Sequence, residues 1–296
     1  MRRHPYLLLA GAALFWAGNF VLGRAMRGHI PPVGLAFWRW SLALAILLAF
    51  QGRRLLAQRA ALLERRWVVV ALGVLGVGNF NLFLYAGLRE TTATNALLLN
   101  AAAPAFILAL SFASGQGRPS ARMIVGVLLS LVGVAAILSR GELASLLALR
   151  LNPGDLWVLA AVLSWSIYTV LLPRRPPGVE PMVLLTATVI VGTAWITPFY
   201  LWEISRGLHV TPDAATLASI LYVGLFASLA AYALWNAGVA LAGPGRAGVA
   251  LNLMPAFGTI LAVLLLGEPF RPFQAVGIGL IVAGVTLAQS RAILPP

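Results

Sequence analysis

Cysteine and lysine are both absent from the 296-residue sequence, and charged residues make up only 10% of it. Without cysteine the chain has no disulfide framework, no thiolate nucleophile and no zinc–sulfur site. Without lysine it has no nucleotide-binding P-loop, because that motif requires one. The sequence also has no spacing typical of metal ligands or of a nucleophilic triad. We therefore expect no cofactor, no metal and no enzymatic activity.

The scarcity of charge excludes a water-soluble fold. Soluble domains carry about 25% charged residues, whereas this chain is 60% hydrophobic, with 21 basic and 8 acidic residues. The net charge of +13 does not indicate nucleic acid, because most arginines lie between apolar runs, where the positive-inside rule places them. We predict an integral membrane protein whose partners are the lipid bilayer and a small molecule, with no nucleic acid.

Apolar runs long enough to cross a bilayer recur along the whole chain. A membrane-spanning helix needs about 20 residues. The first run, which follows Arg2 and Arg3, is interpreted as a permanent span because it has no convincing small-residue cleavage site. The predicted spans are 5–23, 33–50, 67–88, 91–113, 121–138, 155–172, 181–202, 216–239, 244–266 and 272–290.

The distribution of arginine predicts the orientation. With a cytoplasmic N-terminus and an even number of spans, the inside segments hold thirteen arginines and two acids. The outside segments then hold seven arginines and six acids. This bias places both the N- and the C-terminus in the cytoplasm.

The chain repeats itself at a shift of 151 residues. Residues 104–106 (Pro-Ala-Phe) align with 255–257 without a gap, and the glycines at 126 and 133 align with those at 277 and 284. Near the start of each half the shift is 149 residues, which pairs Trp16 with Trp165. Shared apolar composition is a weak explanation for ungapped matches of this kind, so we interpret them as an internal repeat.

Each half therefore holds five spans, the first in residues 1–140 and the second in residues 151–291. Because five is odd, the second half enters the membrane from the opposite side. Inverted repeats are typical of secondary transporters, whose substrate site lies near the bilayer midplane between the halves. The predicted fold is an all-α integral membrane protein, with ten transmembrane helices in two inverted five-helix repeats around a central cavity.

Short motifs along nearly the whole chain resemble those of a known family. They are residues 16–20 (WAGNF), Pro31, Pro32, Arg39, Pro104, Pro255 and the Gly267-Glu268 pair followed by Gln274, Gly277 and Gly284. The chain resembles ten-span EamA-type members of the drug/metabolite transporter superfamily, and is most similar to amino-acid exporters of the YddG type. One departure is Gly117, which stands where the second half has Glu268. The resemblance implies export of amino acids or related metabolites from a bacterial cytoplasm.

Polar and aromatic side chains inside spans are the candidates for lining the cavity, because such groups are costly against lipid. Asn81 and Tyr85 share a helix face, and the 151-residue shift pairs them with Tyr232 and Asn236. The alternative is that these groups only bond neighbouring helices. The predicted substrate-binding residues are Trp16, Asn19, Asn81, Tyr85, Asn100, Trp165, Tyr168, Tyr232, Asn236 and Asn252.

Three further residues have two interpretations each. Pro104 and Pro255 lie inside the fourth and ninth spans, where proline leaves the carbonyl four residues earlier without its partner. They are predicted hinges, and a purely structural role is the alternative. Arg39 is the one charge in the interior of a predicted span. It either receives a substrate carboxylate, or it snorkels to the interface or pairs with backbone carbonyls. The repeat-paired glycines are expected to let helices pack closely.

No acid or histidine lies in the interior of a predicted span, since Asp155 stands at the first residue of its span. This favours facilitated transport or exchange over proton coupling. We predict a secondary transporter that exports small metabolites, chiefly amino acids including aromatic and apolar ones, across the bacterial inner membrane by alternating access. The alternatives are export of drugs or other metabolites, a membrane enzyme and a channel. The substrate, the coupling and the oligomeric state stay open, with a monomer as the working expectation.

Overall fold

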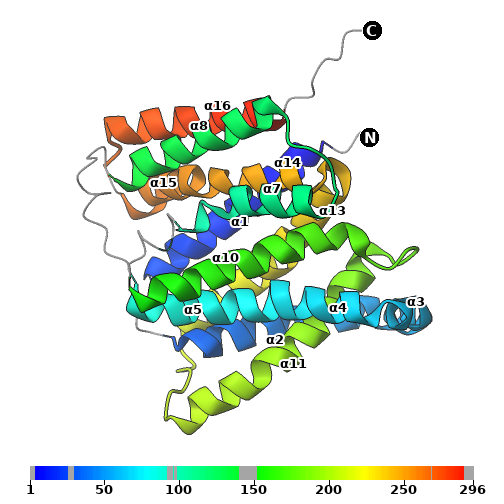
Figure 1. Ribbon diagram of the computed structural model, residues 1–296. Coiled ribbons are helices and arrows are strands. Elements are labelled where there is room, and N and C mark those ends of the chain that lie inside the picture. Colours follow the sequence, from blue (N-terminus) through cyan, green and yellow to red (C-terminus); the bar gives the residue numbers. More distant parts are fainter. Residues whose placement is uncertain are drawn as a thin grey trace.

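The computed structural model describes residues 4–25, 30–91, 96, 99–139, 152–267 and 269–289. These residues form helices and short connections, with no β-strand among them. Figure 1 shows the helices running side by side in a bundle. Glu268, one of the motif residues above, lies outside the described residues.

The first half contains spans one to five. Its described helices are α1 (Pro5–Ala25), α2 (Pro32–Ala57), α3 (Arg59–Glu64), α4 (Arg66–Leu72), the π-helix η1 (Gly73–Asn79), α5 (Phe80–Glu90), α7 (Ala103–Ala113) and α8 (Ala121–Leu138). Helices α4, η1 and α5 follow one another without a break, so together they form the third span.

The second half repeats this order. Its described helices are α10 (Pro153–Leu171), the 3₁₀-helix η2 (Leu172–Arg174), α11 (Pro181–Ser205), α12 (Ala214–Tyr222), the π-helix η3 (Val223–Ala230), α13 (Ala231–Ala242), α14 (Pro244–Val249), the 3₁₀-helix η4 (Ala250–Asn252), α15 (Leu253–Leu266) and α16 (Pro272–Gln289). The run from α12 to α13 forms span eight, and the run from α14 to α15 forms span nine.

The helices account for all ten predicted spans. Eight helical stretches in the described part of the chain are long and apolar enough to cross a membrane, and α7 is a shorter apolar helix. Helix α1 has 21 residues and supplies the remaining span. Large apolar side chains such as Leu7, Phe50 and Leu264 are exposed on the outside of the bundle, as expected where the surrounding solvent is lipid. The predicted all-α membrane fold is confirmed.

The connection predicted at residues 51–66 is itself helical. Helix α2 continues to Ala57, seven residues beyond the predicted end of its span, and α3 follows it directly. The local sequence is rich in Leu, Ala, Arg and Gln, which are strong helix formers, and it contains no proline. This propensity extends the helix past the apolar run that marks the span.

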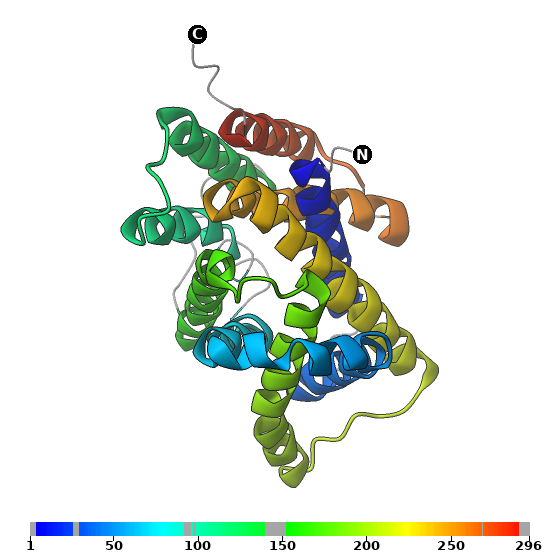
Figure 2. The ribbon, with the colours of Figure 1, turned by 90° about the vertical axis from the view of Figure 1, so that its right-hand side faces the viewer.

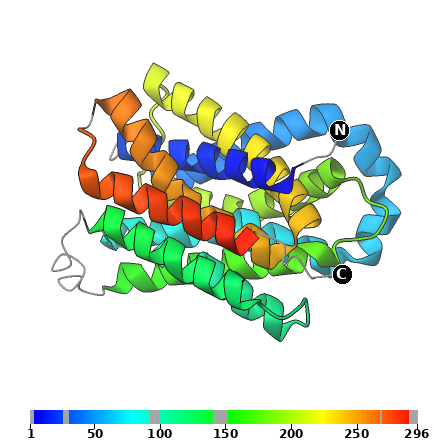
Figure 3. The same ribbon diagram turned by 90° about the horizontal axis from the view of Figure 1, so that it is seen from above.

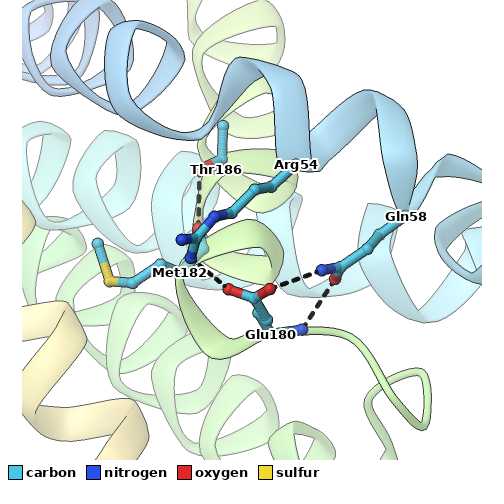
Figure 4. Close-up of polar contacts among 5 residues, drawn as sticks. All are labelled: Arg54, Gln58, Glu180, Met182 and Thr186. Atoms are coloured by element: carbon cyan, nitrogen blue, oxygen red, sulfur yellow. Dashed lines mark hydrogen bonds and ion pairs between the residues drawn. The ribbon is translucent and has the colours of Figure 1, made fainter.

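The extension of α2 is tied to the start of α11, which belongs to the other half (Figure 4). Arg54 Nη1 lies 2.8 Å from Glu180 Oε2, and the Gln58 amide nitrogen donates to Glu180 Oε1 at 3.0 Å. In the next turn Thr186 donates to the carbonyl of Met182 at 2.7 Å. Because Arg54 and Glu180 are exposed, their ion pair contributes at most about 1 kcal/mol. The end of the bundle that holds α3, the end of α2 and the start of α11 is called the α3 face below.

The contact between α8 and α16 displays the inverted relation of the halves. The two helices lie side by side (Figures 1 and 3). A Cβ on Gly126 would lie 2.5 Å from the carbonyl oxygen of Gly284, and a Cβ on Gly133 would lie 2.6 Å from that of Gly277. The 151-residue shift carries Gly126 to Gly277 and Gly133 to Gly284. Each glycine of α8 therefore contacts the repeat counterpart of the other α8 glycine. Antiparallel helices related by a two-fold axis have this register.

The first helix of each half packs against the other half. Helix α1 contacts α13 and α15, and α10 contacts α5 and α7. Figure 2 looks along the bundle, with α8 and α16 at one edge and α2 and α11 at the other. Tyr6, at the start of α1, donates to the carbonyl of Gln289, at the end of α16, at 2.7 Å. The start of α1 and the end of α16 therefore meet at the same end of the bundle.

Spans three and eight both contain a π-helix, which the sequence analysis did not predict. The 151-residue shift carries η1 onto 224–230, which is η3 without its first residue. Gly73 of η1 packs on α11, where an added Cβ would lie 2.7 Å from the carbonyl oxygen of Thr188. Its counterpart Gly224 packs on α2, where an added Cβ would lie 2.8 Å from the Leu42 side chain. π-Helical turns are frequent at functional sites because they interrupt the regular hydrogen-bond ladder.

The glycine contact between α8 and α16 yields a stability prediction. Gly284→Ala places a Cβ 2.5 Å from the Gly126 carbonyl oxygen and 2.6 Å from the Ser130 nitrogen. Such overpacking costs about 1–3 kcal/mol, so the unfolding temperature in detergent should fall. Gly279→Ala is the matched control on the same helix, because its Cβ meets nothing within 4 Å. Equal unfolding temperatures for the two variants would refute the close packing.

Candidate functional site

A small cavity lies where the two halves meet. It has a volume of about 40 Å³, which admits water but is far below the roughly 300–1,000 Å³ of small-molecule pockets. In this conformation the helices leave too little space at the site for a small-molecule substrate. The lining residues are Trp16, Asn19, Arg39, Phe80, Asn81, Leu84, Tyr85, Asn100, Trp165, Tyr232, Leu251 and Met254.

Two tryptophans place the cavity near the middle of the membrane. Trp16 lies 11 residues from the start of α1, and Trp165 lies 12 residues from the start of α10. At 1.5 Å per residue these positions are about 16 and 18 Å along two helices that start on opposite faces. A hydrocarbon core is about 30 Å thick, so both tryptophans lie close to its midplane.

Among the described residues that line the cavity, Arg39, from α2, is the only charged one. Its Nε donates to Ser228 Oγ at 2.8 Å, and its Nη1 lies 3.3 Å from Asn81 Oδ1 and 3.4 Å from the Tyr85 hydroxyl. The guanidinium carbon also lies 5.3 Å from the ring centre of Trp40. The side chain is only 3% exposed. All these partners are neutral, so within the described residues the charge of Arg39 is not balanced by a carboxylate.

The Asn81 side chain fixes the position of Arg39. Its amide nitrogen donates to the Val77 carbonyl at 2.8 Å, so its oxygen points to the guanidinium. Val77 lies in the π-helix η1. Since Asn81 and Tyr85 are one helical turn apart on α5, both reach Arg39 from the same face, as the spacing of these residues predicted.

Three aromatic rings line the side of the cavity that is nearer to the α3 face. The ring centres of Trp16 and Trp165 are 5.1 Å apart with the rings nearly perpendicular, and Tyr232 lies 5.8 Å from Trp16 and 5.4 Å from Trp165. Edge-to-face contacts at these distances stabilise each pair by about 0.5–1.5 kcal/mol. The repeat-paired tryptophans thus meet each other at the contact between the halves.

Two carbonyls of the π-helices accept hydrogen bonds from these aromatic residues. The Tyr232 hydroxyl donates to the Gly76 carbonyl at 2.6 Å, and Trp16 Nε1 donates to the Ala227 carbonyl at 2.9 Å. The 151-residue shift carries Gly76 to Ala227, so the two acceptors occupy equivalent positions. Each π-helix is therefore bonded at the same point by a side chain that lines the cavity.

Three predicted residues lie outside the cavity. The Tyr168 hydroxyl donates to Asn236 Oδ1 at 2.6 Å. This pair lies between the three aromatic rings and the α3 face. Asn252 donates to Ser130 Oγ of α8 at 2.7 Å, so it bonds a neighbouring helix. The other seven predicted substrate-binding residues and Arg39 line the cavity.

The two prolines lie at helix starts. Pro104 is the second residue of α7, which follows a turn at residues 101–102, and Pro255 is the third residue of α15, which follows the 3₁₀-helix η4. Proline is tolerated in a first turn because its missing N–H would have no partner within the helix. Both spans are thus interrupted just before their proline, at equivalent positions. The hinge role remains a prediction.

Sequence reasoning missed four apolar lining residues and Ser228. Phe80, Leu84, Leu251 and Met254 line the cavity, and in sequence they are indistinguishable from apolar residues that face lipid. Helical spacing offered a signal for the first two, because Phe80 and Leu84 flank Asn81 and Tyr85 on α5. Ser228 belongs to the site because it accepts the hydrogen bond from Arg39 Nε. No helical spacing marked it, since it lies in the π-helix η3.

The expectation that no acid lies inside a span requires correction. Helix α11 runs to Ser205, three residues past the predicted end of its span, and so includes the buried Glu203. Its carboxylate accepts from the backbone N–H groups of Val33 and Gly34, at 3.3 and 2.6 Å, and so caps α2. The buried Asp155 closes a capping box with Asn152 at the start of α10. Both acids hold helix ends, where they complement the N-terminal dipole.

Comparison with known proteins identifies the family. The sequence profile of the EamA-like transporter family matches residues 4–139 and 152–289, once in each half. The chain belongs to this family of membrane transporters in the drug/metabolite transporter superfamily.

Individual relatives agree with this membership. An uncharacterized transporter of Archaeoglobus fulgidus is 30% identical over 98% of this chain and 99% of its own length. A Salmonella typhimurium protein described as a "Probable amino-acid metabolite efflux pump" is 26% identical over 96% of this chain and 94% of its own length. A crystal structure with 22% identity has the same fold, with a TM-score of 0.80 and 97% of both chains covered.

The bond to η1 can be tested through stability. Tyr232→Phe leaves the buried Gly76 carbonyl without this donor, and an unsatisfied buried polar group costs about 1–3 kcal/mol. We expect a lower unfolding temperature in detergent. Tyr200→Phe is the matched control, because the hydroxyl of Tyr200 bonds Trp38 at an exposed site. A Tyr232→Phe protein as stable as the control would contradict a structural role for this bond.

Proposed function

We propose that the chain is a secondary transporter that exports amino acids and related metabolites by alternating access. Arg39 carries this proposal, as a buried cation whose described partners are all neutral. A buried charge without an opposite charge is costly, and in membrane proteins such charges face cavities and bind ligands or ions. The guanidinium matches a carboxylate in a two-pronged geometry. No described residue accepts a hydrogen bond from its Nη2, and in this proposal that nitrogen binds the carboxylate.

The rest of the cavity complements the other parts of an amino acid. Asn19 and Asn100 line it, and the oxygen of an asparagine side chain is an acceptor for an ammonium group. Apolar and aromatic walls from Phe80, Leu84 and Met254 suit an apolar side chain. The printed description of the Salmonella typhimurium relative, an amino-acid metabolite efflux pump, supports the same substrate class.

The narrow cavity supports a mechanism in which the halves move. A site of about 40 Å³ does not admit an amino acid until the helices around it separate. The interruptions at η1, η3, Pro104 and Pro255 lie in four of the spans that line the cavity, so we assign the bending to these four spans. The two buried acids cap helices and do not line the cavity, which favours exchange or facilitated transport over a carboxylate-based proton relay.

The arginine distribution supports a place in the bacterial inner membrane with both termini in the cytoplasm. Under this orientation the α3 face is cytoplasmic, because the inside segments include residues 51–66 and 173–178. Export then runs from the α3 face to the opposite face.

Counterflow in liposomes tests the substrate class. We expect saturable uptake of apolar or aromatic amino acids and no uptake of the corresponding amides, which lack the carboxylate. Arg39→Gln should weaken amino-acid affinity at least ten-fold, since loss of a charge-assisted bond costs about 1.5–3 kcal/mol and 1.4 kcal/mol is ten-fold in affinity. Arg54→Gln, at the exposed Arg54–Glu180 ion pair, is the control and should transport normally.

Other results would select the alternatives. Equal uptake of amino acids and their amides would contradict the role of Arg39, and uptake of drugs alone would indicate a different substrate class. Flux that does not saturate would identify a channel rather than a carrier.

A further inference from the structure

A second and larger cavity opens near the α3 face. Its volume is about 300 Å³, which reaches the lower limit of typical small-molecule pockets and exceeds the central cavity several-fold. It lies between the end of the α10–η2 run, the end of α13 and the connection after α7. The lining residues are Gln116, Leu172, Pro173, Arg175, Val239, Ala240, Gly243 and Pro244.

The same two helical runs line both cavities. On the α10–η2 run, Trp165 lines the central cavity and Leu172 the second one. On α13, Tyr232 lines the central cavity and Val239 the second one. Each pair is seven residues apart, which is about 10 Å along a helix. The two cavities therefore lie in line, separated by about two helical turns.

Within the described part of the chain, a side-chain hydrogen bond joins the two helices at the barrier between the cavities. Tyr168, 1% exposed, donates to Asn236, 5% exposed, at 2.6 Å. The Tyr168 ring lies 5.1 Å from the ring of Trp165 and 6.2 Å from that of Tyr232. Tyr168 comes from α10 and Asn236 from α13, so the bond must break if these helices are to separate there.

The second cavity has the chemistry of the proposed substrate. Arg175 is half-buried and supplies a cation, while Leu172, Val239 and Ala240 supply an apolar wall. A charge beside an apolar wall is also what Arg39 and its neighbours provide in the central cavity. A small amphipathic carboxylate therefore fits both sites.

We propose that this α3-face cavity is a second binding site for amphipathic carboxylates such as apolar amino acids, and that the Tyr168–Asn236 bond is the gate between it and the central cavity. The inference rests on the proposed function. Substrate binds first beside Arg175, and separation of α10 and α13 then opens the way to Arg39. Gln116 holds the connection after α7 against α10, through a bond to the Val170 carbonyl at 2.9 Å, and so maintains one wall of the site.

The binding site is tested by affinity measured separately from each face. In liposomes that hold the protein in one orientation, Arg175→Gln should raise the half-saturating amino-acid concentration at least three-fold from the α3 face and leave it unchanged from the other face. Arg174→Gln is the control, because Arg174 is the exposed neighbour and does not line the cavity. An Arg175→Gln effect that is absent, or equal from both faces, overturns the site.

The gate is tested without any ligand. The chain has no cysteine, so Leu84→Cys places a single thiol in the central cavity. Adding Tyr168→Phe should increase its labelling rate from the α3 face several-fold, because the bond that holds the barrier closed is lost. Tyr222→Phe is the control, since its hydroxyl bonds the Phe15 carbonyl at 3.3 Å and Tyr222 lines neither cavity. Unchanged labelling in Tyr168→Phe overturns the gate.

The outcomes separate this inference from the proposed function. If the wild-type protein transports amino acids but the Arg175→Gln effect shows no sidedness, the second site is refuted and the transport function stands. If the wild-type protein transports none of the amino acids tested, the proposed substrate class fails, and the second site fails with it. The labelling experiment still decides whether Tyr168 and Asn236 form the barrier.

Discussion

A polar group inside an apolar bundle needs a partner within the bundle, because lipid offers none. This constraint accounts for the centre of the molecule. The π-helices interrupt the backbone ladder, and the Gly76 and Ala227 carbonyls accept bonds from Tyr232 and Trp16 instead. Arg39 obeys the same constraint only in part, since its Nε and Nη1 bond neutral groups and no described carboxylate balances its charge. In the proposed function, a ligand that carries the opposite charge completes the arrangement.

The inverted repeat explains why these groups meet. Two copies that enter the membrane from opposite faces bring equivalent positions together at the midplane, and Trp16 and Trp165 make edge-to-face contact there. The close crossing of α8 and α16 at their glycines holds the two halves at one edge. The π-helices and the interrupted fourth and ninth spans then leave the helices around the cavity less regular than those at the edge. Regular and interrupted helices are thus separated within one bundle.

Much of this architecture was predictable because hydropathy and self-similarity report it directly. The ten spans, the repeat and the glycine contacts all follow from patterns of period or shift. The π-helices were not predictable, since Gly73 and Gly224 acquire their meaning only from packing on α11 and α2. The sequence also does not say how far along its span a side chain lies from the cavity. Asn236 shares a helix face with Tyr232, but it lies one turn closer to the α3 face and is therefore outside the cavity. Glu203 was assigned to a connection because the apolar run ends before the helix does.

Access to the central cavity from each face is the most direct measure of this account. Met254→Cys introduces a single thiol at the cavity wall, and a membrane-impermeant maleimide can be applied to one face at a time. The account predicts labelling from both faces, slowed in each case by a transported amino acid and not by its amide. Labelling from one face only, or labelling that the amino acid does not slow, would contradict a central site that opens alternately to the two sides of the membrane.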